Sequence, residues 1–373
     1  MKQIVIIPDS FKGTLSAKEI CAIVAERVHA HFPDCACVSI PIADGGEGTL
    51  DCFAEGVGGE KIFCDVSGPF GERMRAPYLK LPDGTAVVEM AVCAGLPLVG
   101  DRKDPLTATT FGVGELIRHA VESGCRRIIV GLGGSATNDC GCGAAAALGT
   151  RFYRADGRAF VPTGGTLTQI SCIEKANLPH DLQIIAMCDI DNPLYGKNGA
   201  AYVFAPQKGA NEETVQLLDF GLRHVADRIE KDLHTDVHSL SGAGAAGGFG
   251  AGLFAFCDAA LQSGIETVLD TVEFDAILRK TDVVFSGEGK LDTQSLGGKA
   301  VIGVAGRCKA QGVPLIALVG GAQRGLPQVF DTGVTAVFPI GRLPEDFSIS
   351  RQYSAENLRE TADNVLRLLK LHL

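Results

Sequence analysis

DVVFSGEGKLDTQSLGGK, residues 282–299, joins a short apolar segment to a loop rich in glycine and charged side chains. The apolar residues at 283–285 are typical of a strand that is buried on both faces of a parallel sheet. Ligands bind beyond the carboxyl ends of such strands, and glycine lets the backbone approach a ligand closely. The polar side chains after the strand are Ser286, Glu288, Lys290, Asp292, Gln294 and Lys299. Carboxylates suit Mg²⁺ and lysines suit phosphate oxygens, so we expect an active-site loop for a metal-bound polyphosphate.

The beginning of the chain repeats this arrangement, which disfavours the alternative of a solvated turn at residues 282–299. QIVIIP, residues 3–8, predicts a second buried parallel strand, and Ser10 and Lys12 follow it directly. Ser16 and Glu19 have the spacing of a capping box, which predicts the start of a helix. At the end of a strand, Lys12 is better explained as a phosphate ligand than as a solvated side chain.

Two carboxylates also follow a strand that we expect near residues 37–42. Asp44 and Glu47 flank the pair Gly45-Gly46, and a helix is expected from Thr49. A tight turn accounts for the glycines, but it does not account for the two acids.

A further apolar strand, expected at residues 183–187, leads into Asp189 and Asp191. Side chains two residues apart project to the same side if the strand continues. We therefore expect either two metal ligands or one metal ligand and one base at this strand end. The alternative is a turn that begins at Asp191-Asn192-Pro193.

GLGGSATND, residues 131–139, follows a strand that we expect at 127–130. Amides and hydroxyls in such a loop suit an anion. The candidates are Gly133, Gly134, Ser135 and Thr137, with Asn138 and Asp139 beside them. The spacing matches neither the dinucleotide fingerprint nor the Walker A loop. GAGAAGG at 242–248 contains one G-x-G-x-x-G, but no strand pattern precedes it, so close backbone packing or phosphate approach explains it better.

The order of the expected strands divides the chain into two α/β domains. Strands of a parallel sheet are expected at 3–8, 37–42, 282–286, 314–319 and 335–339. A meander at 61–67, 74–80 and 85–91 signals a different sheet. Helices are expected at 109–123, 144–148, 211–233 and 354–371, the last capped by Ser354. We expect residues 1–60 plus 275–373 to form one domain, interrupted by an inserted mixed α/β domain of residues 61–274, with the active site in the cleft between them.

The amino-acid composition and the net charge limit the kinds of function and location that the protein can have. The 373 residues include 47 glycines and no tryptophan, which suits a chain rich in loops and backbone-lined ligand sites. A net charge of −10 disfavours a broad nucleic-acid or anionic-membrane surface, so small molecules are the expected partners. The 13 cysteines lie scattered in apolar runs and lack zinc or redox spacing, which indicates reduced thiols and a cytoplasmic location.

Seven motifs share their order and spacing with a known family. They are PDSFKGTLSA (8–17), DGGEGT (44–49), GVGELI (112–117), GLGGSATND (131–139), CDIDNPL (188–194), GAGAAGG (242–248) and GEGKLDTQSLGGK (287–299). Together they closely resemble the bacterial glycerate kinases that phosphorylate the 2-hydroxyl of D-glycerate, over essentially the whole chain. The resemblance implies an ATP- and Mg²⁺-dependent enzyme that yields 2-phosphoglycerate, with a flavodoxin-like domain interrupted by a second α/β domain. Cys140 departs from the pattern, because glycine is expected after the Asn-Asp pair.

Residue roles follow from combining this resemblance with the needs of phosphoryl transfer, which are positioning, charge neutralisation and a base. Asp189 and Asp191 are expected to supply the base and a metal ligand, in an order that stays open. Lys12 and Lys290 are expected to neutralise the transferring phosphoryl group. Contacts to the metal and to the glycerate hydroxyls are expected from Asp44, Glu47, Glu288 and Asp292, with Asp292 as a third candidate Mg²⁺ ligand.

The remaining candidates concern phosphate and the substrate carboxylate. The backbone of Gly133, Gly134 and Ser135 is expected to hold nucleotide phosphate. Ser10, Asn138 and Lys299 are further candidates for substrate or phosphate binding. The cation for the glycerate carboxylate is Arg73, Arg324 or Lys299, and the sequence does not choose between them.

Two other classes of function remain as alternatives. A nicotinamide-dependent oxidoreductase needs a phosphate fingerprint after the first strand, and Pro8-Asp9-Ser10 is not one. A sensor of sugar acids or nucleotides has little use for acid-and-lysine loops at several strand ends. The oligomeric state is expected to be a monomer or a homodimer.

Overall fold

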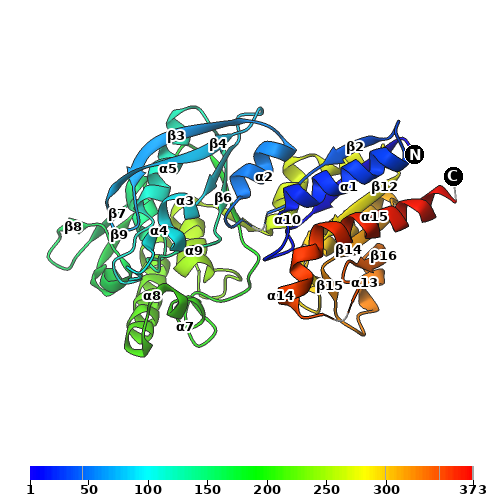
Figure 1. Ribbon diagram of the computed structural model, residues 1–373. Coiled ribbons are helices and arrows are strands. Elements are labelled where there is room, and N and C mark those ends of the chain that lie inside the picture. The colour runs from blue at the N-terminus through cyan, green and yellow to red at the C-terminus, as the bar shows by residue number, and fades with distance from the viewer. Residues whose placement is uncertain (44, 299, 344, 372–373) are drawn as a thin grey trace. The chain divides into compact units, whose positions relative to one another are not determined.

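The computed structural model describes residues 1–43, 45–298, 300–343 and 345–371 (Figure 1). The chain forms two compact units. The first unit comprises Met1–Asp44, Asp51–Gly58 and Gly264–Leu373, and the second comprises Gly45–Leu50 and Gly59–Ser263. Both units combine helices with a β-sheet, which confirms the predicted α/β class.

The first unit contains a five-stranded parallel sheet in the order β16-β14-β12-β1-β2. Its strands are β1 (Gln3–Pro8), β2 (Ala36–Ser39), β12 (Val283–Gly287), β14 (Leu315–Val319) and β16 (Val334–Pro339). Numbered along the chain, these strands have the spatial order 2-1-3-4-5, which is the flavodoxin-like arrangement. β1 and β12 are neighbours with Pro8 paired to Gly287, so the loops after both strands leave the same edge of the sheet.

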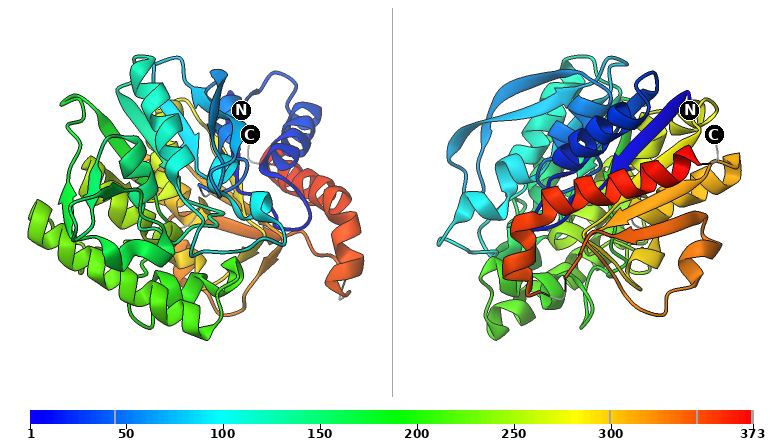
Figure 2. Two further views of the ribbon diagram at one scale, coloured as in Figure 1. Left: turned by 90° about the vertical axis from the view of Figure 1, so that its left-hand side faces the viewer. Right: turned by 45° about the vertical axis from the view of Figure 1, so that its right-hand side comes forward.

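Helices cover both faces of this sheet. The helices of the first unit are α1 (Ala17–His31), α10 (Gly264–Thr271), α11 (Phe274–Leu278), α12 (Ala300–Gln311), α13 (Gln328–Asp331), α14 (Phe347–Ser350), α15 (Ser354–Lys370) and α2 (Thr49–Gly56), whose first two residues belong to the second unit. Helices α1 and α15 lie side by side and share one core with alternate residues of the strands, such as Ile4 and Phe285 (Figure 2). Alternation along the strands turns the neighbouring residues, such as Val5 and Val284, to the opposite face, and α12 packs against β1, β12 and β14.

The helix ends show which local predictions hold. Ser16 and Glu19 form the predicted capping box, in which the Ser16 hydroxyl accepts from the Glu19 amide and the Glu19 carboxylate accepts from the Ser16 amide. Ser354 does not cap the last helix as predicted, because it is the first helical residue and Tyr353 occupies the capping position. The strand expected at 37–42 is β2, which ends at Ser39, but the amides of Ile40 and Ile42 still donate to the Ile6 and Pro8 carbonyl oxygens of β1.

The second unit is built on a six-stranded mixed sheet in the order β11-β10-β6-β5-β4-β3. Its strands are β3 (Glu60–Ser67), β4 (Arg73–Lys80), β5 (Ala86–Glu89), β6 (Arg127–Gly131), β10 (Gln183–Met187) and β11 (Ala260–Gln262). The predicted meander forms the antiparallel pairs β3–β4 and β4–β5, and the remaining pairs are parallel. A separate three-stranded sheet, which was not predicted, consists of β7 (Arg151–Tyr153), β8 (Ala159–Phe160) and β9 (Cys172–Glu174).

The helices of the second unit surround a large apolar core. They are α3 (Ala91–Ala94), α4 (Leu96–Val99), α5 (Phe111–Glu122), α6 (Cys142–Ala147), α7 (Ala200–Phe204), α8 (Glu212–Leu233) and α9 (Ala245–Cys257). Helix α9 is kinked, because Ala246, Gly247 and Gly248 all have left-handed backbone angles. A Cβ on Gly247 would lie 2.1 Å from the Thr137 carbonyl oxygen, so these glycines permit the close backbone packing expected at 242–248. None of the described helices has the length and hydropathy that a membrane crossing needs.

Candidate active site

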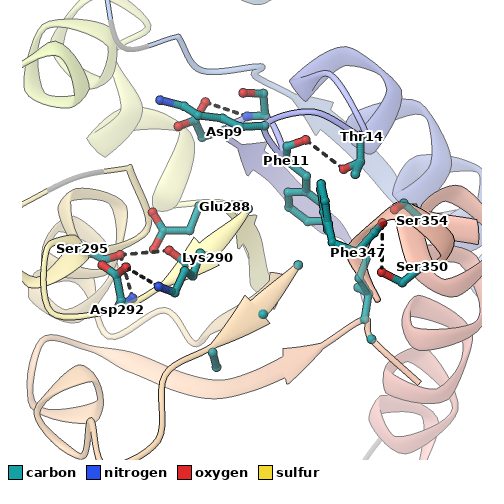
Figure 3. A pocket seen from close by; sticks show the side chains of 18 of the residues that line it. Asp9, Phe11, Thr14, Glu288, Lys290, Asp292, Ser295, Phe347, Ser350 and Ser354 are labelled. Carbon is teal, nitrogen blue, oxygen red and sulfur yellow. Dashed lines mark hydrogen bonds and ion pairs between the residues drawn. The ribbon is translucent and has the colours of Figure 1, made fainter. Parts of the chain in front are cut away.

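A pocket of about 640 Å³ lies in the first unit at the carboxyl ends of β1 and β12 (Figure 3). It contains five of the residues predicted from the sequence, namely Ser10, Lys12, Glu288, Lys290 and Asp292. The first two follow β1 and the others follow β12, and the two strands are neighbours in the sheet. The parallel pairing therefore brings together segments that are about 280 residues apart in the sequence.

Glycines fix the loop after β12 against the loop after β14. Lys290 and Leu291 form the short strand β13, which pairs with Gly321 and Ala322 of β15. The Gly320 amide donates to the Glu288 carbonyl oxygen at 3.1 Å. A Cβ on Gly320 would lie only 2.4 Å from the Gly289 carbonyl oxygen, so the close approach of these loops requires glycine.

Lys290 and Asp292 form an ion pair at the rim of this pocket. The Lys290 ammonium lies 3.3 Å from the Asp292 carboxylate, and 70% of the lysine side chain is exposed. Partial desolvation raises the pKa of Asp292, but the Gln294 amide and the Lys290 ammonium outweigh it and hold the pKa below its usual value. Asp292 is therefore ionised at neutral pH, as a metal ligand must be, and the exposed ammonium is accessible to an anion.

The other side chains of this loop differ in their roles. Glu288 lines the pocket and is buried. Ser286, although polar, donates its hydroxyl to the Ile7 carbonyl oxygen at 2.8 Å and so ties β12 to β1. Lys12 is exposed in the loop after β1. Lys299 and Asp44 were predicted as site residues, and both lie outside the described part of the chain.

Asp189 and Asp191 lie in the second unit, in the loop after β10. Both side chains are exposed, and the Asp191 carboxylate accepts a hydrogen bond from the Ser241 hydroxyl at 3.0 Å. The Cys188 thiol donates to the Ile190 and Gly242 carbonyl oxygens and steadies the same loop. Two exposed carboxylates on one loop fit a magnesium ion, which typically takes one or two carboxylates together with water and substrate oxygens. Within residues 1–43, 45–298, 300–343 and 345–371, no group of three or more metal-binding side chains comes together.

The loop at 131–139 packs against the segment that carries Glu47. The Gly133 amide donates to the Gly45 carbonyl oxygen at 2.9 Å, and a Cβ on Gly133 would lie 2.4 Å from the Gly46 Cα. The Gly133 amide is thus already engaged within the protein, whereas Gly134 is exposed with a φ of 71°. Glu47 itself is exposed.

The end of this loop is buried. Asn138 has no exposed surface, and its side-chain amide has no hydrogen-bond partner among the described residues. The neighbouring Asp139 carboxylate accepts from the Thr110 amide and hydroxyl and from the amides of Gly141 and Gly143. Burial raises the pKa of Asp139, and these hydrogen bonds oppose the increase. Cys140, where glycine was expected, has a φ of 54°, which explains why glycine suits this position.

Lys208 was not predicted as a site residue from the sequence, yet its side chain holds this loop through two hydrogen bonds. Its ammonium donates to the Ser135 hydroxyl at 2.8 Å and to the Thr137 carbonyl oxygen at 2.6 Å, and only 2% of the residue is exposed. Burial lowers the pKa of Lys208 to about 7, and the Asp139 carboxylate opposes the decrease. PQKGA, residues 206–210, contains no pattern from which burial could be read.

The candidates for a carboxylate-binding cation differ in their surroundings. Arg73 pairs with Glu115 at 3.1 Å and also donates to the Asp65 carbonyl oxygen. Arg324 is exposed, and the structure gives it no partner among the described residues. Both arginines are exposed, but only Arg73 is already engaged by these contacts.

Comparison with known proteins identifies relatives over the whole chain. Residues 4–370 match the model of the glycerate kinase family. A glycerate kinase of Bacillus subtilis is 41% identical over 99% of this chain and 98% of its own, and a glycerate 2-kinase of Escherichia coli K12 is 43% identical over 92% and 93%. A crystal structure from Salmonella typhimurium LT2, provisionally described as glycerate kinase 2, matches with a TM-score of 0.87 at 41% identity, covering 100% of this chain and 99% of that one.

Proposed function

The chain belongs to the glycerate kinase family, and we propose on that premise that it transfers the γ-phosphoryl group of ATP to the 2-hydroxyl of D-glycerate. The products are 2-phosphoglycerate and ADP. The observation that carries the proposal is the pocket of the first unit, where Lys12 and Lys290 accompany the carboxylates Glu288 and Asp292 at one edge of a parallel sheet. Phosphoryl transfer depends on positioning and charge neutralisation, and this set of side chains supplies both.

Each lysine has a defined task in this proposal. Lys12 and Lys290 neutralise the phosphoryl group as negative charge spreads over its oxygens, and Ser10 donates a hydrogen bond to the same group. Lys290 suits this task because its side chain is largely exposed, lines the pocket and pairs with Asp292. The backbone of the exposed residue Gly134, with Ser135 beside it, is a further candidate contact to nucleotide phosphate, while the Gly133 amide is bound to the Gly45 carbonyl oxygen.

Asp189 and Asp191 supply the base for the attacking hydroxyl and a ligand for Mg²⁺, in an order that stays open. A carboxylate base accepts the proton of the 2-hydroxyl as its oxygen attacks phosphorus. Bound Mg²⁺ neutralises charge on the β- and γ-phosphate oxygens, and Asp292 is a further candidate ligand. Asp44, Glu47 and Glu288 share contacts to the metal and the glycerate hydroxyls. Asn138 is a further candidate for substrate or phosphate binding, and its side chain is buried.

Three further proposals concern the protein as a whole. Its domains are residues 1–60 plus 275–373 and residues 61–274, whereas the compact units of the fold have their boundary at Gly264. Limited proteolysis followed by mass spectrometry tests the proposed bounds through the positions of the first cuts. The protein acts in the cytoplasm on small molecules without a nucleic-acid or membrane partner. It is a monomer or a homodimer, which light scattering distinguishes.

The experiment that tests the reaction combines the protein with ATP, Mg²⁺, D-glycerate and enolase, without phosphoglycerate mutase. Enolase converts only 2-phosphoglycerate to phosphoenolpyruvate, so absorbance from phosphoenolpyruvate reports transfer to the 2-hydroxyl. We expect a signal that disappears when either Mg²⁺ or D-glycerate is omitted. ADP formation without phosphoenolpyruvate indicates transfer to the 3-hydroxyl and overturns the regiochemistry. No ADP formation with D-glycerate overturns the proposed function.

A further inference from the structure

The pocket of the first unit has two sides of different chemistry. Figure 3 shows Glu288, Lys290 and Asp292 together on one side, with Phe347 and Ser354 on the opposite side. The first side is charged, whereas the second combines an aromatic ring with hydroxyl groups. Because Glu288 and Asp292 outnumber Lys290 on the charged side, a ligand that fills the pocket needs an anionic end that carries a metal ion, and an end with a flat apolar face.

Phe347 is unusual because its ring lines the pocket without being covered. The residue is 61% exposed, whereas Phe11, the other phenylalanine in the pocket lining, is 2% exposed and belongs to the core. A Cβ on Gly13 would lie 3.9 Å from Phe347 Cζ, so the ring borders the loop after β1. An aromatic ring that remains in water lacks the stabilisation that its burial would give. A planar ligand that stacks on this ring recovers that stabilisation.

We propose that this pocket is the nucleotide site and that the purine base of the phosphoryl donor stacks on Phe347, with its polyphosphate directed toward Lys12 and Lys290. This inference rests on the proposed kinase function and assigns its donor to the first unit. The proposal accounts for both sides of the pocket with one ligand. Stacking of a base on an aromatic side chain stabilises binding by about 1–3 kcal/mol, which corresponds to about 5- to 150-fold in affinity.

The size of the pocket favours a nucleotide over the acceptor. Pockets of roughly 300–1000 Å³ are typical for ligands of drug size, a class that includes nucleotides. A three-carbon acid leaves most of a volume of about 640 Å³ unfilled. A three-carbon acid also has no flat face for Phe347.

The polar side chains that line the pocket near Phe347 can form hydrogen bonds with the ribose or with the edge of the purine base. Ser350, Ser354 and Asn357 all line the pocket on the side of α14 and α15. The Asn357 side chain, three residues after Ser354 on the same helix, forms no hydrogen bond in the part of the chain that the structure describes. An amide with one acceptor and two donors can read the edge of a purine.

The decisive experiment compares how Phe347 variants bind ATP and inorganic tripolyphosphate, which has no base. We expect Phe347→Ala to weaken ATP binding about tenfold or more in titration calorimetry while leaving tripolyphosphate binding unchanged. Phe347→Tyr retains the ring and is expected to retain ATP affinity. Phe330→Ala is the matched control, because Phe330 is 54% exposed in the same unit but does not line the pocket.

A direct readout comes from Phe347→Trp, which introduces the only tryptophan of a chain that has none. We expect its fluorescence to be quenched on titration with ATP and not with tripolyphosphate. Unchanged ATP affinity in Phe347→Ala, or equal loss for both ligands, overturns the stacking proposal.

The kinase assay separates this inference from the function on which it rests. If wild-type protein phosphorylates D-glycerate but Phe347→Ala keeps its KM for ATP, only the base site is wrong. If wild-type protein shows no turnover but Phe347→Trp responds to ATP, the nucleotide site is supported and the glycerate kinase function is overturned. Absence of both turnover and ATP binding overturns both.

Discussion

The Lys208 ammonium donates a hydrogen bond to the Ser135 hydroxyl at 2.8 Å, and both residues are buried in the second unit. A second hydrogen bond from the same ammonium, to the Thr137 carbonyl oxygen, holds the backbone two residues further on. One buried cation thereby fixes the conformation of the loop whose exposed residue, Gly134, we assign to phosphate. Since an ammonium buried without a full ionic partner is costly, this arrangement makes stability depend on pH.

Stability is expected to rise with pH above 7 because of Lys208. Its pKa is about 7 in the folded protein against 10.5 without burial, so between these values the unfolded chain binds a proton that the folded protein does not. Relative to Lys208→Met, the free energy of unfolding of the wild type should increase by about 2 kcal/mol between pH 7 and pH 9. Urea denaturation of both proteins at the two pH values measures this difference. A difference that does not change with pH shows that Lys208 does not titrate in this range.

Asp191→Asn is expected to reduce kcat by roughly 10²–10⁴-fold without unfolding the protein, because the amide can neither accept the substrate proton nor match a carboxylate as a Mg²⁺ ligand. The Asp191 side chain is exposed, so its replacement leaves the core intact. Steady-state kinetics and circular dichroism check the two parts of this prediction. Asp156→Asn, at an exposed acid between β7 and β8, serves as control and should keep wild-type kcat. Retained turnover in Asp191→Asn removes this residue from the mechanism.

Gly320 and Gly321 are adjacent, yet they should respond differently to alanine. A Cβ on Gly320 meets the Gly289 carbonyl oxygen at 2.4 Å, whereas a Cβ on Gly321 has no heavy atom within 4 Å. Gly320→Ala should cost about 1–3 kcal/mol in stability. It should also lower kcat/KM by roughly a hundredfold, because it displaces the loop that carries Lys290. Gly321→Ala should keep the wild-type melting temperature. Equal melting temperatures for the two variants contradict the packing described here.

Gly306→Ala is expected to stabilise the protein. Gly306 lies in the interior of α12, it is exposed, and a Cβ there meets nothing within 4 Å. Alanine in a helix interior is favoured over glycine by about 1 kcal/mol. Thermal unfolding followed by circular dichroism should show a higher midpoint with unchanged kinase activity. A lower midpoint indicates a contact of α12 that the structure does not show.

Local signals in the sequence determined the secondary structure and the loops that carry polar groups. Continuous apolar runs such as residues 3–8 identify buried parallel strands because both faces of such strands are covered. The capping box of Ser16 and Glu19 is equally local, since its hydrogen bonds join residues three apart. The order of seven motifs was enough to indicate the family, to which the chain does belong. The short three-stranded sheet and helix α12 escaped prediction, because brief or weakly amphipathic segments carry little periodic signal.

The tertiary structure alone decided which of these groups meet. The register of β1 against β12 brings Lys12 and Lys290 to one pocket, and no local pattern specifies pairing across 270 or more residues. Burial of Lys208 and exposure of Phe347 likewise depend on distant segments, since lysine side chains are mostly exposed in proteins and phenylalanine side chains are mostly buried. Secondary structure follows from interactions within a few residues, whereas burial and the meeting of loops are properties of the packed chain.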